Sequence, residues 1–226
     1  MTEHHISVTR SARYFVLGDG GAAPDEIWFA LHGYGQLASR FARAFEPLAG
    51  AGRMIVVPEA LSRFYVDAPA AASHTHARVG ATWMTREDRE HEIADHVAYL
   101  DALAERLLAG GAAPPRVHVL GFSQGVATAA RWVVRGRVRA DRLTLWGGTL
   151  PQELGGDQSA GERLRGMRRV TLVGGAGDAL VTPDAMAQQE RTLRGLGVAS
   201  HLLTFDGGHE LHPETLRALA ASDTGG

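Results

Sequence analysis

Three residues in this sequence have the types and the chain order that nucleophilic acyl transfer needs: Ser123, Asp178 and His209. A serine hydroxyl is a poor nucleophile near neutral pH, so it requires a base within hydrogen-bond reach and an acid that orients the base. Ser123 is the central residue of the motif GFSQG at 121–125, between a short apolar strand and a helix. Such a turn strains its central residue and exposes the hydroxyl above the sheet, so the motif predicts that Ser123 is a nucleophile.

The candidate acid and base each follow a predicted strand. Asp178 comes after the strand at 170–173, and His209 comes after the strand at 200–205. The order serine, aspartate, histidine is the one expected for a nucleophile on the turn of a parallel sheet. Asp206 is a rival acid, but it is close in sequence to His209, whereas the orienting carboxylate normally comes from a different strand end. We therefore favour Asp178 as the acid and His209 as the base.

Acyl transfer also needs hydrogen-bond donors for the oxygen that becomes negative in the tetrahedral intermediate. The segment LHGYG at 31–35 follows a predicted strand, and the residue after the candidate nucleophile is Gln124. The backbone NH groups of Tyr34 and Gln124 are the expected donors. Because backbone donors depend on position more than on side-chain type, we expect Tyr34→Ala to be mild and a bulky residue at Gly33 to be severe.

The elements that must position these residues alternate between strand and helix. The predicted strands cover 6–17 (a strand or a hairpin), 26–31, 54–57, 116–120, 142–146, 170–173 and 200–205. The predicted helices cover 39–48, the periodic apolar run 93–108 that ends before two glycines, 124–135, 183–196 and 213–221. Thr85 and Asp88 have the spacing of a capping box ahead of the second helix. This alternation predicts an α/β fold with a mostly parallel sheet and helices on both faces.

Two segments, 60–82 and 147–166, interrupt the alternation and are expected to be loops. Long loops in a small domain are often functional, and ligands of open parallel sheets bind beyond the carboxyl ends of the strands. The segment 60–82 follows a strand at that edge. It is therefore a candidate wall of the binding cleft.

Composition limits the classes of function. The chain of 226 residues is expected to form a single domain over 1–226, with a short flexible tail near 222–226. It is 45% hydrophobic and has no apolar run of eighteen residues, so we expect no integral membrane association. The first ten residues are polar and show no signal peptide, which makes the cytoplasm the expected location. A net charge of -2 gives no general attraction to nucleic acid, and the absence of cysteine excludes disulfides and thiolate catalysis.

Five segments together resemble the phospholipase/carboxylesterase family of α/β-hydrolases, which includes acyl-protein thioesterases. They are LHGYG at 31–35, VGATWMTRED at 79–88, GFSQG at 121–125, GAGDALV at 175–181 and GGHE at 207–210. The resemblance implies a single-domain α/β-hydrolase fold and a small-molecule ester or thioester as substrate, with no cofactor and no metal. It implies the same nucleophile, acid, base and oxyanion donors as the residues above. It also implies a substrate pocket near Trp83, Met84 and Val181.

Two positions depart from the acyl-protein thioesterase pattern. Gln36 stands where those enzymes usually carry aspartate, and Pro58-Glu59-Ala60 stands where they usually have Pro-Asn-Ala-Pro. The chain looks more like small bacterial esterases of the same family, and the substrate and the oligomeric state stay open.

Other classes of function compete with this interpretation. The segment 33–38 fits the dinucleotide fingerprint G-x-G-x-x-A, and Glu59 after the next strand would bind a ribose in an NAD(P)-dependent oxidoreductase. That alternative leaves Ser123, Asp178 and His209 unexplained. A protein that keeps the fold as a non-catalytic binding module is a second alternative.

A metal enzyme is disfavoured by the spacing of its histidines. His91 and His96 are five residues apart on a predicted helix, so their side chains point about 140° apart rather than to one face. His74 and His76 lie in the segment 60–82 and are expected to be exposed.

Overall fold

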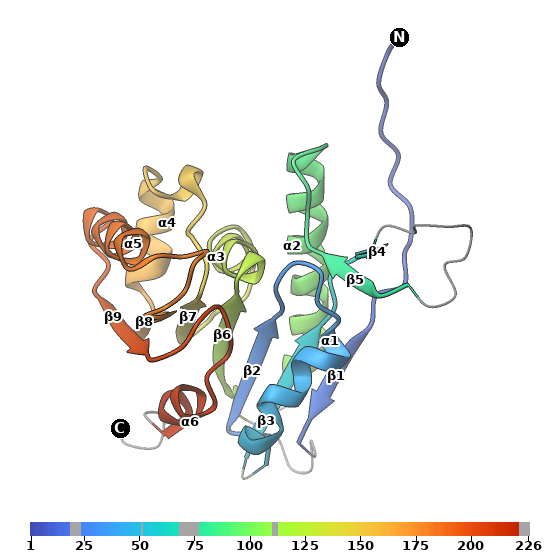
Figure 1. Ribbon diagram of the computed structural model, residues 1–226. Coiled ribbons are helices and arrows are strands. Elements are labelled where there is room, and N and C mark those ends of the chain that lie inside the picture. The colour runs from blue at the N-terminus through green and yellow to red at the C-terminus, as the bar shows by residue number, and fades with distance from the viewer. Residues whose placement is uncertain (19–23, 51, 68–76, 110–112, 222–226) are drawn as a thin grey trace.

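A twisted central sheet with the strand order β1-β3-β2-β6-β7-β8-β9 organises the computed structural model (Figure 1). The structure describes residues 1–18, 24–50, 52–67, 77–109 and 113–221. Within these ranges β1 is antiparallel to β3, and the other neighbouring strands of this sheet are parallel. The strands are β1 (Tyr14–Leu17), β2 (Glu26–Leu31), β3 (Arg53–Pro58), β6 (Arg116–Phe122), β7 (Arg142–Trp146), β8 (Arg169–Gly175) and β9 (Ser200–Phe205).

Helices cover both faces of the sheet (Figure 1). One face carries α2 (Arg89–Leu108), α3 (Gln124–Arg135), α4 (Gln158–Arg165) and α5 (Pro183–Gly195), and the other carries α1 (Ala38–Phe41), the 3-10 helix η1 (Ala42–Leu48) and α6 (Pro213–Ala221). A short 3-10 turn, η2 (Gln152–Leu154), precedes α4. Alternate residues of β2 feed the two apolar clusters: Phe29 packs in the cluster under α2 to α5, and Trp28 packs in the cluster under α1, η1 and α6. This two-sided burial explains why the central strands are mostly apolar rather than alternating between apolar and polar residues.

The parallel strands bring three chain segments to one edge of the sheet. β6, β8 and β9 run in the same direction, so the residues that follow them emerge at the same edge. Ser123 directly follows β6, whereas Asp178 and His209 lie a few residues beyond β8 and β9. The topology therefore places the three candidate residues in one region before any side chain is considered.

Most of the predicted elements are confirmed. The α/β architecture is as expected, and the predicted bounds 26–31, 124–135, 142–146, 200–205 and 213–221 agree with β2, α3, β7, β9 and α6. Within the described residues, no helix combines the length and the apolarity that crossing a membrane requires. The expected tail at 222–226 lies outside the described residues.

The prediction of a strand over 6–17 is wrong for its first part. Only β1 pairs with β3, and residues 6–13 are exposed and have no strand partner among the described residues. The expected helix at 39–48 is also wrong in type, because α1 ends at Phe41 and continues as η1. Pro47 lies inside η1 and has no NH to donate, so a regular α-helix is disfavoured there.

Both expected loops contain regular structure. Within 60–82, β4 (Ser62–Tyr65) and β5 (Val79–Thr82) form a small antiparallel sheet, while residues 68–76, with His74 and His76, lie outside the described residues. Within 147–166, α4 is an unpredicted helix whose N-terminal cap is Asp157. The capping box at Thr85 is wrong as well: α2 starts after Asp88 without a side-chain cap, and the NH of Thr85 donates to Glu92.

Candidate active site

Ser123 has a backbone conformation that only a tightly packed turn can hold. Its φ is +54° and its ψ is −118°, and Asp88 is the only other non-glycine residue with positive φ in the described part of the chain. A Cβ at Gly121 would come within 2.3 Å of the carbonyl oxygen of Gly125, and a Cβ at Gly125 would come within 2.3 Å of that of Leu31. The two glycines of the motif therefore let the turn close against the neighbouring backbone.

His209 bridges the serine and the aspartate. Its Nε2 lies 2.9 Å from Ser123 Oγ, and its Nδ1 lies 2.8 Å from Asp178 Oδ2. Since a carboxylate only accepts, Nδ1 carries the proton and Nε2 is left to accept from the serine hydroxyl. Asp206, the rival acid, is exposed and makes no contact with His209 in the structure.

Asp178 is held as an anion by its surroundings. Burial opposes ionisation, but NH groups donated to Oδ1 by Val181 (3.0 Å) and Leu180 (2.8 Å), together with His209, keep the pKa of the carboxyl below its usual value. Gly147, with a φ of +56°, leaves space beside the pair, because a Cβ there would lie 3.4 Å from the His209 ring. An ionised Asp178 fixes the orientation of the imidazole and favours its protonated form.

The loop after β2 lies directly beside Ser123. A Cβ on Gly33 would approach Ser123 Cβ to 3.0 Å, and the side chain of Gln36 accepts the NH of Gly33 at 2.8 Å. Among the described residues, the NH groups of Tyr34 and Gln124 donate to no other group. Two amides that are free next to the serine have the character expected of oxyanion donors.

His32 anchors the same loop from below. It is fully buried, its Nε2 accepts the NH of Ala60 at 3.1 Å, and its Nδ1 lies 2.8 Å from the carbonyl oxygen of Gly33. Because Nε2 must accept, Nδ1 carries the proton and donates to Gly33. Burial lowers the pKa of His32, which keeps the imidazole neutral and preserves both bonds.

The side chain of Gln124 ties the turn to the segment after β5. Its Oε1 accepts the NH of Trp83 at 3.1 Å, and its Nε2 donates to Thr82 Oγ1 and to the carbonyl of Met84, both at 2.9 Å. The indole NH of Trp83 donates to the carbonyl of His32 at 2.8 Å. Trp83 therefore links both loops that flank Ser123.

The three residues predicted to line a substrate pocket differ in burial. Trp83 is 3% exposed and Val181 is 6% exposed, and both belong to the apolar core. Met84 is half-buried, and its sulfur lies 3.2 Å from Arg131 Nη1. Among the described residues, neither Trp83 nor Val181 lines a cavity beside His209, so their part in substrate binding stays a prediction.

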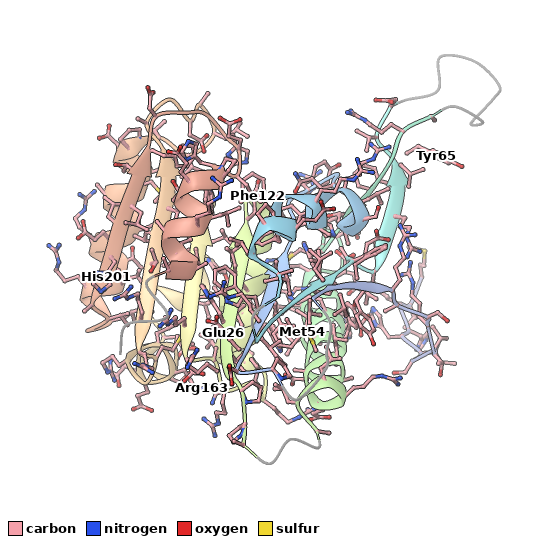
Figure 2. The ribbon with its side chains drawn as sticks, turned by 90° about the horizontal axis from the view of Figure 1, so that it is seen from below. Glu26, Met54, Tyr65, Phe122, Arg163 and His201 are labelled. Atoms are coloured by element: carbon pink, nitrogen blue, oxygen red, sulfur yellow. The ribbon has the colours of Figure 1, made fainter. Side chains whose placement is uncertain are left out.

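A cavity of about 390 Å³ opens beside His209. It is lined by 35–37, by α1, by Phe122 and by 209–211, with Arg78 and Val79 closing one side. Figure 2 shows Phe122 in the interior of the molecule, with Tyr65 and His201 on opposite sides of it. The segment 60–82 was predicted to form a wall of the cleft, and its part at 78–79 does line this cavity.

Sequence reasoning missed the residues that hold these loops in place. The side chains of Gln36, His32 and Trp83 act through backbone groups, and a pairing between a side chain and a distant amide leaves no periodic signal in the sequence. The departure of Gln36 from the aspartate of acyl-protein thioesterases was the one available hint. Gly147 could not be identified among 28 glycines.

Possible cofactor and metal ligands lie elsewhere. Glu59 is 1% exposed, and its carboxylate binds Arg13 at 2.7 Å and Arg63 at 2.6 Å, so it has no free oxygen for a ribose. His91 is exposed and His96 is buried, as their spacing predicted. In the described ranges, one exposed group, His5 with Asp88 and His91, has three metal-type ligand atoms within 4.8 Å of one another. None of its members belongs to the cavity or contacts Ser123.

Several solved structures share this architecture. Acyl-protein thioesterase 2 from Zea mays has a TM-score of 0.68 and 21% identity, with 95% of this chain and 98% of that chain covered. A carboxylesterase from Mesorhizobium loti has a TM-score of 0.68 and 18% identity over 95% of each chain. The Bacillus cereus carboxylesterase has a TM-score of 0.62 and 12% identity over 93% of this chain and 94% of that chain.

A scan against protein-family models found no match, and a search of curated proteins found none either. At such low identities the structural likeness establishes the fold, which is that of an α/β-hydrolase, and it covers nearly the whole chain.

Proposed function

We propose that this chain, which has the α/β-hydrolase fold, is a serine hydrolase that cleaves carboxylic esters or thioesters through an acyl-enzyme. One observation carries the proposal: His209 lies 2.9 Å from the hydroxyl of Ser123 and 2.8 Å from the carboxylate of Asp178. The strained backbone of Ser123 adds to it, since a positive φ at a serine is costly and persists where the surrounding structure enforces it.

The first half of the proposed cycle forms the acyl-enzyme. His209 Nε2 takes the proton of Ser123 as Oγ attacks the carbonyl carbon, and the NH groups of Tyr34 and Gln124 bind the resulting oxyanion. When the tetrahedral intermediate collapses, the bond from carbon to the leaving oxygen or sulfur breaks. His209 gives its proton to that leaving group, while Asp178 stays ionised throughout.

The second half returns the enzyme to its starting state. His209 takes a proton from water, and the hydroxide equivalent attacks the acyl carbon. Collapse of the second intermediate releases the carboxylic acid, and Ser123 recovers its proton from the imidazole.

The two alternative functions have less support. A dinucleotide-binding loop at 33–38 would need an acidic residue for the ribose, and the carboxylate of Glu59 is already bound by Arg13 and Arg63. A non-catalytic binding module would have no need for the strained Ser123 or for the two free amides beside it.

Hydrolysis of p-nitrophenyl esters of increasing acyl length tests the proposal. The native protein is compared with Ser123→Ala and with Ser11→Ala, a control variant at an exposed serine. We expect Ser123→Ala to lose turnover by at least about a thousandfold and Ser11→Ala to keep it. Equal activity of the native protein and Ser123→Ala would refute the role of Ser123. Native protein that binds these esters without hydrolysing them would favour the binding module.

A further inference from the structure

The cavity beside His209 has a mixed lining of apolar and polar residues, and the polar ones include arginines. Its apolar lining includes Leu37, Phe41 and Phe122, and two arginine side chains, those of Arg40 and Arg78, also line it. A neutral fatty ester needs only an apolar cavity, because each charged group that loses water costs free energy unless it is paired. Both arginines are exposed, so their guanidinium groups lose little water where they are and stay available to an anionic ligand.

Arg40 is the cation without a partner. It is exposed, and within the described ranges its guanidinium makes no ion pair or hydrogen bond with another residue. Arg78 Nη2 lies 3.3 Å from Asp67 Oδ1, and both of these side chains are more than half exposed. An exposed ion pair of this kind contributes little, so Arg78 can exchange Asp67 for another anion at small cost.

Glu210 is the acidic residue in the lining, and its carboxylate lies beside Gly207 in its own loop. Glu210 Oε1 lies 2.9 Å from the position that a Cβ on Gly207 would occupy, so the side chain folds back over its own loop. Its backbone carbonyl accepts the indole NH of Trp146 at 2.9 Å, which fixes the loop. Among the described lining residues, Arg40 is the arginine that has no ion-pair partner for an anionic ligand to displace.

We propose that this cavity binds an anionic group of the substrate, a carboxylate separated from the scissile ester by an apolar spacer, and that Arg40 selects it. The proposal rests on the proposed hydrolase function and names its substrate class. Leu37 and Phe41 would pack against the spacer while the guanidinium of Arg40 binds the carboxylate, which suits the planar fork of its donors.

The test compares matched anionic and neutral esters. Mono-p-nitrophenyl esters of adipic, pimelic and suberic acid carry the carboxylate on the acyl side, and their methyl esters are neutral controls of nearly equal size. Shorter half-esters are avoided because their carboxylates attack the ester intramolecularly. A second pair, 4-acetoxybenzoate and its methyl ester, carries the carboxylate on the alcohol side.

We expect kcat/KM for the anionic member of at least one pair to exceed that of its neutral control by about ten- to a hundredfold at low salt, and to approach it at high salt. A preference for the anionic dicarboxylic half-esters would mean that the cavity binds the acyl part of the substrate. A preference for 4-acetoxybenzoate would mean that it binds the alcohol part. Both outcomes support the proposal.

Substitutions of Arg40 and Arg43 test which residue causes the preference for anionic esters. Arg40→Gln is expected to remove most of the preference by raising KM for the anionic ester relative to its neutral control, and Arg40→Lys is expected to keep part of it. Arg43→Gln is the matched control, because Arg43 is exposed three residues further on and does not line the cavity.

Two results would overturn the inference. The first is hydrolysis of the esters with no preference for the anionic member of any pair, and the second is a preference that Arg40→Gln leaves unchanged. Either result would refute the selection of an anion by Arg40 without affecting the proposed hydrolase function. Failure to hydrolyse any of these esters would count against the hydrolase function itself, and this inference would fall with it.

Discussion

At the scale of single residues, the position of Ser123 depends on neighbouring glycines, which have no Cβ. A Cβ on Gly148 would lie 2.4 Å from the carbonyl oxygen of Ser123, and one on Gly33 would lie 3.0 Å from its Cβ. The strained turn therefore fits only because backbone approaches it from two sides. The hydroxyl is held at the base before a substrate arrives.

The first prediction concerns the identity of the acid. Asp178→Asn is expected to reduce kcat by about a thousand- to ten-thousandfold, because an amide at this position favours the wrong tautomer of His209. Asp206→Asn is the control and is expected to change kcat less than about threefold, since Asp206 is exposed and makes no contact with His209. Steady-state kinetics on one activated ester measures kcat for both variants. A large loss of kcat in Asp206→Asn with a small loss in Asp178→Asn would identify Asp206 as the acid.

The second prediction concerns the backbone donors. Gly33→Val is expected to reduce kcat by about a hundredfold or more, because its side chain would collide with Ser123 and with Gln36 Oε1 and move the loop. Tyr34→Ala is expected to change kcat by less than about tenfold, because the side chain of Tyr34 is 61% exposed and its NH is retained. A large kcat loss in Tyr34→Ala with normal folding would show that the phenol itself takes part.

At the scale of elements, the sequence predicted strands and helices that have a clear apolar pattern, whereas its one capping prediction, at Thr85, was wrong. β2, α3 and α6 were located to the residue, because each has an uninterrupted apolar pattern and a clear boundary. α4 was missed because it buries only Ala160, Gly161 and Leu164, too few for a helical signal in a polar segment. The order of Ser123, Asp178 and His209 along the chain was enough to predict that their side chains meet, because the ends of parallel strands lie at one edge of the sheet.

The parts of the site that could not be predicted depend on tertiary contacts. β4 and β5 pair across a segment of which 68–76 is not described, and Ala81 of β5 reaches the loop after β2 through its carbonyl, which accepts the NH of Gly35 at 2.9 Å. The side chain of Trp83 completes this connection through His32. Such contacts between distant segments are invisible in a single sequence.

The third prediction tests this connection. Trp83→Phe removes the donor to the buried carbonyl of His32 and is expected to lower the free energy of unfolding by about 1–3 kcal/mol and kcat by several-fold. Trp28→Phe is a matched control, because Trp28 is also buried but its indole NH has no partner among the described residues. Urea unfolding and steady-state kinetics check both variants, and equal losses of kcat would mean that Trp83 acts through packing alone.

At the scale of the whole molecule, buried histidines make stability depend on pH, because burial lowers the pKa of His32, His96 and His118. Burial, with the nearby guanidinium of Arg131, lowers the pKa of His96 to about 4, and burial lowers the pKa of His118 to about 3. In the unfolded chain both imidazoles have the ordinary pKa of 6.5. Between these values the unfolded chain binds protons that the folded chain does not, so stability falls as the pH falls.

The fourth prediction follows from this difference. Between pH 6.5 and pH 5 each of His96 and His118 is expected to lower the free energy of unfolding with a slope that rises from about 0.7 to about 1.4 kcal/mol per pH unit. The carboxyls with lowered pKa, such as Glu153 and Asp178, lose their contribution as the pH falls through their ordinary values of 4.5 and 3.8, mostly below this window. Urea unfolding at several pH values gives the change in the free energy of unfolding per pH unit. This change should be smaller in His96→Leu than in the native protein, and unaltered in His201→Leu, a substitution at an exposed position. Identical slopes in both variants would contradict the assignment to His96.

The central proposal is that Ser123 Oγ is an activated nucleophile, and covalent labelling tests it most directly. A fluorophosphonate is added to the native protein, to Ser123→Ala and to His209→Ala, and the products are measured by intact mass and peptide mapping. Attack by Ser123 Oγ on phosphorus forms one O–P bond and releases fluoride with the proton taken by His209. The account predicts one label per native chain, on Ser123, with none on Ser123→Ala and greatly slowed labelling of His209→Ala. A native chain that stays unlabelled, or that is labelled at another residue, would contradict it.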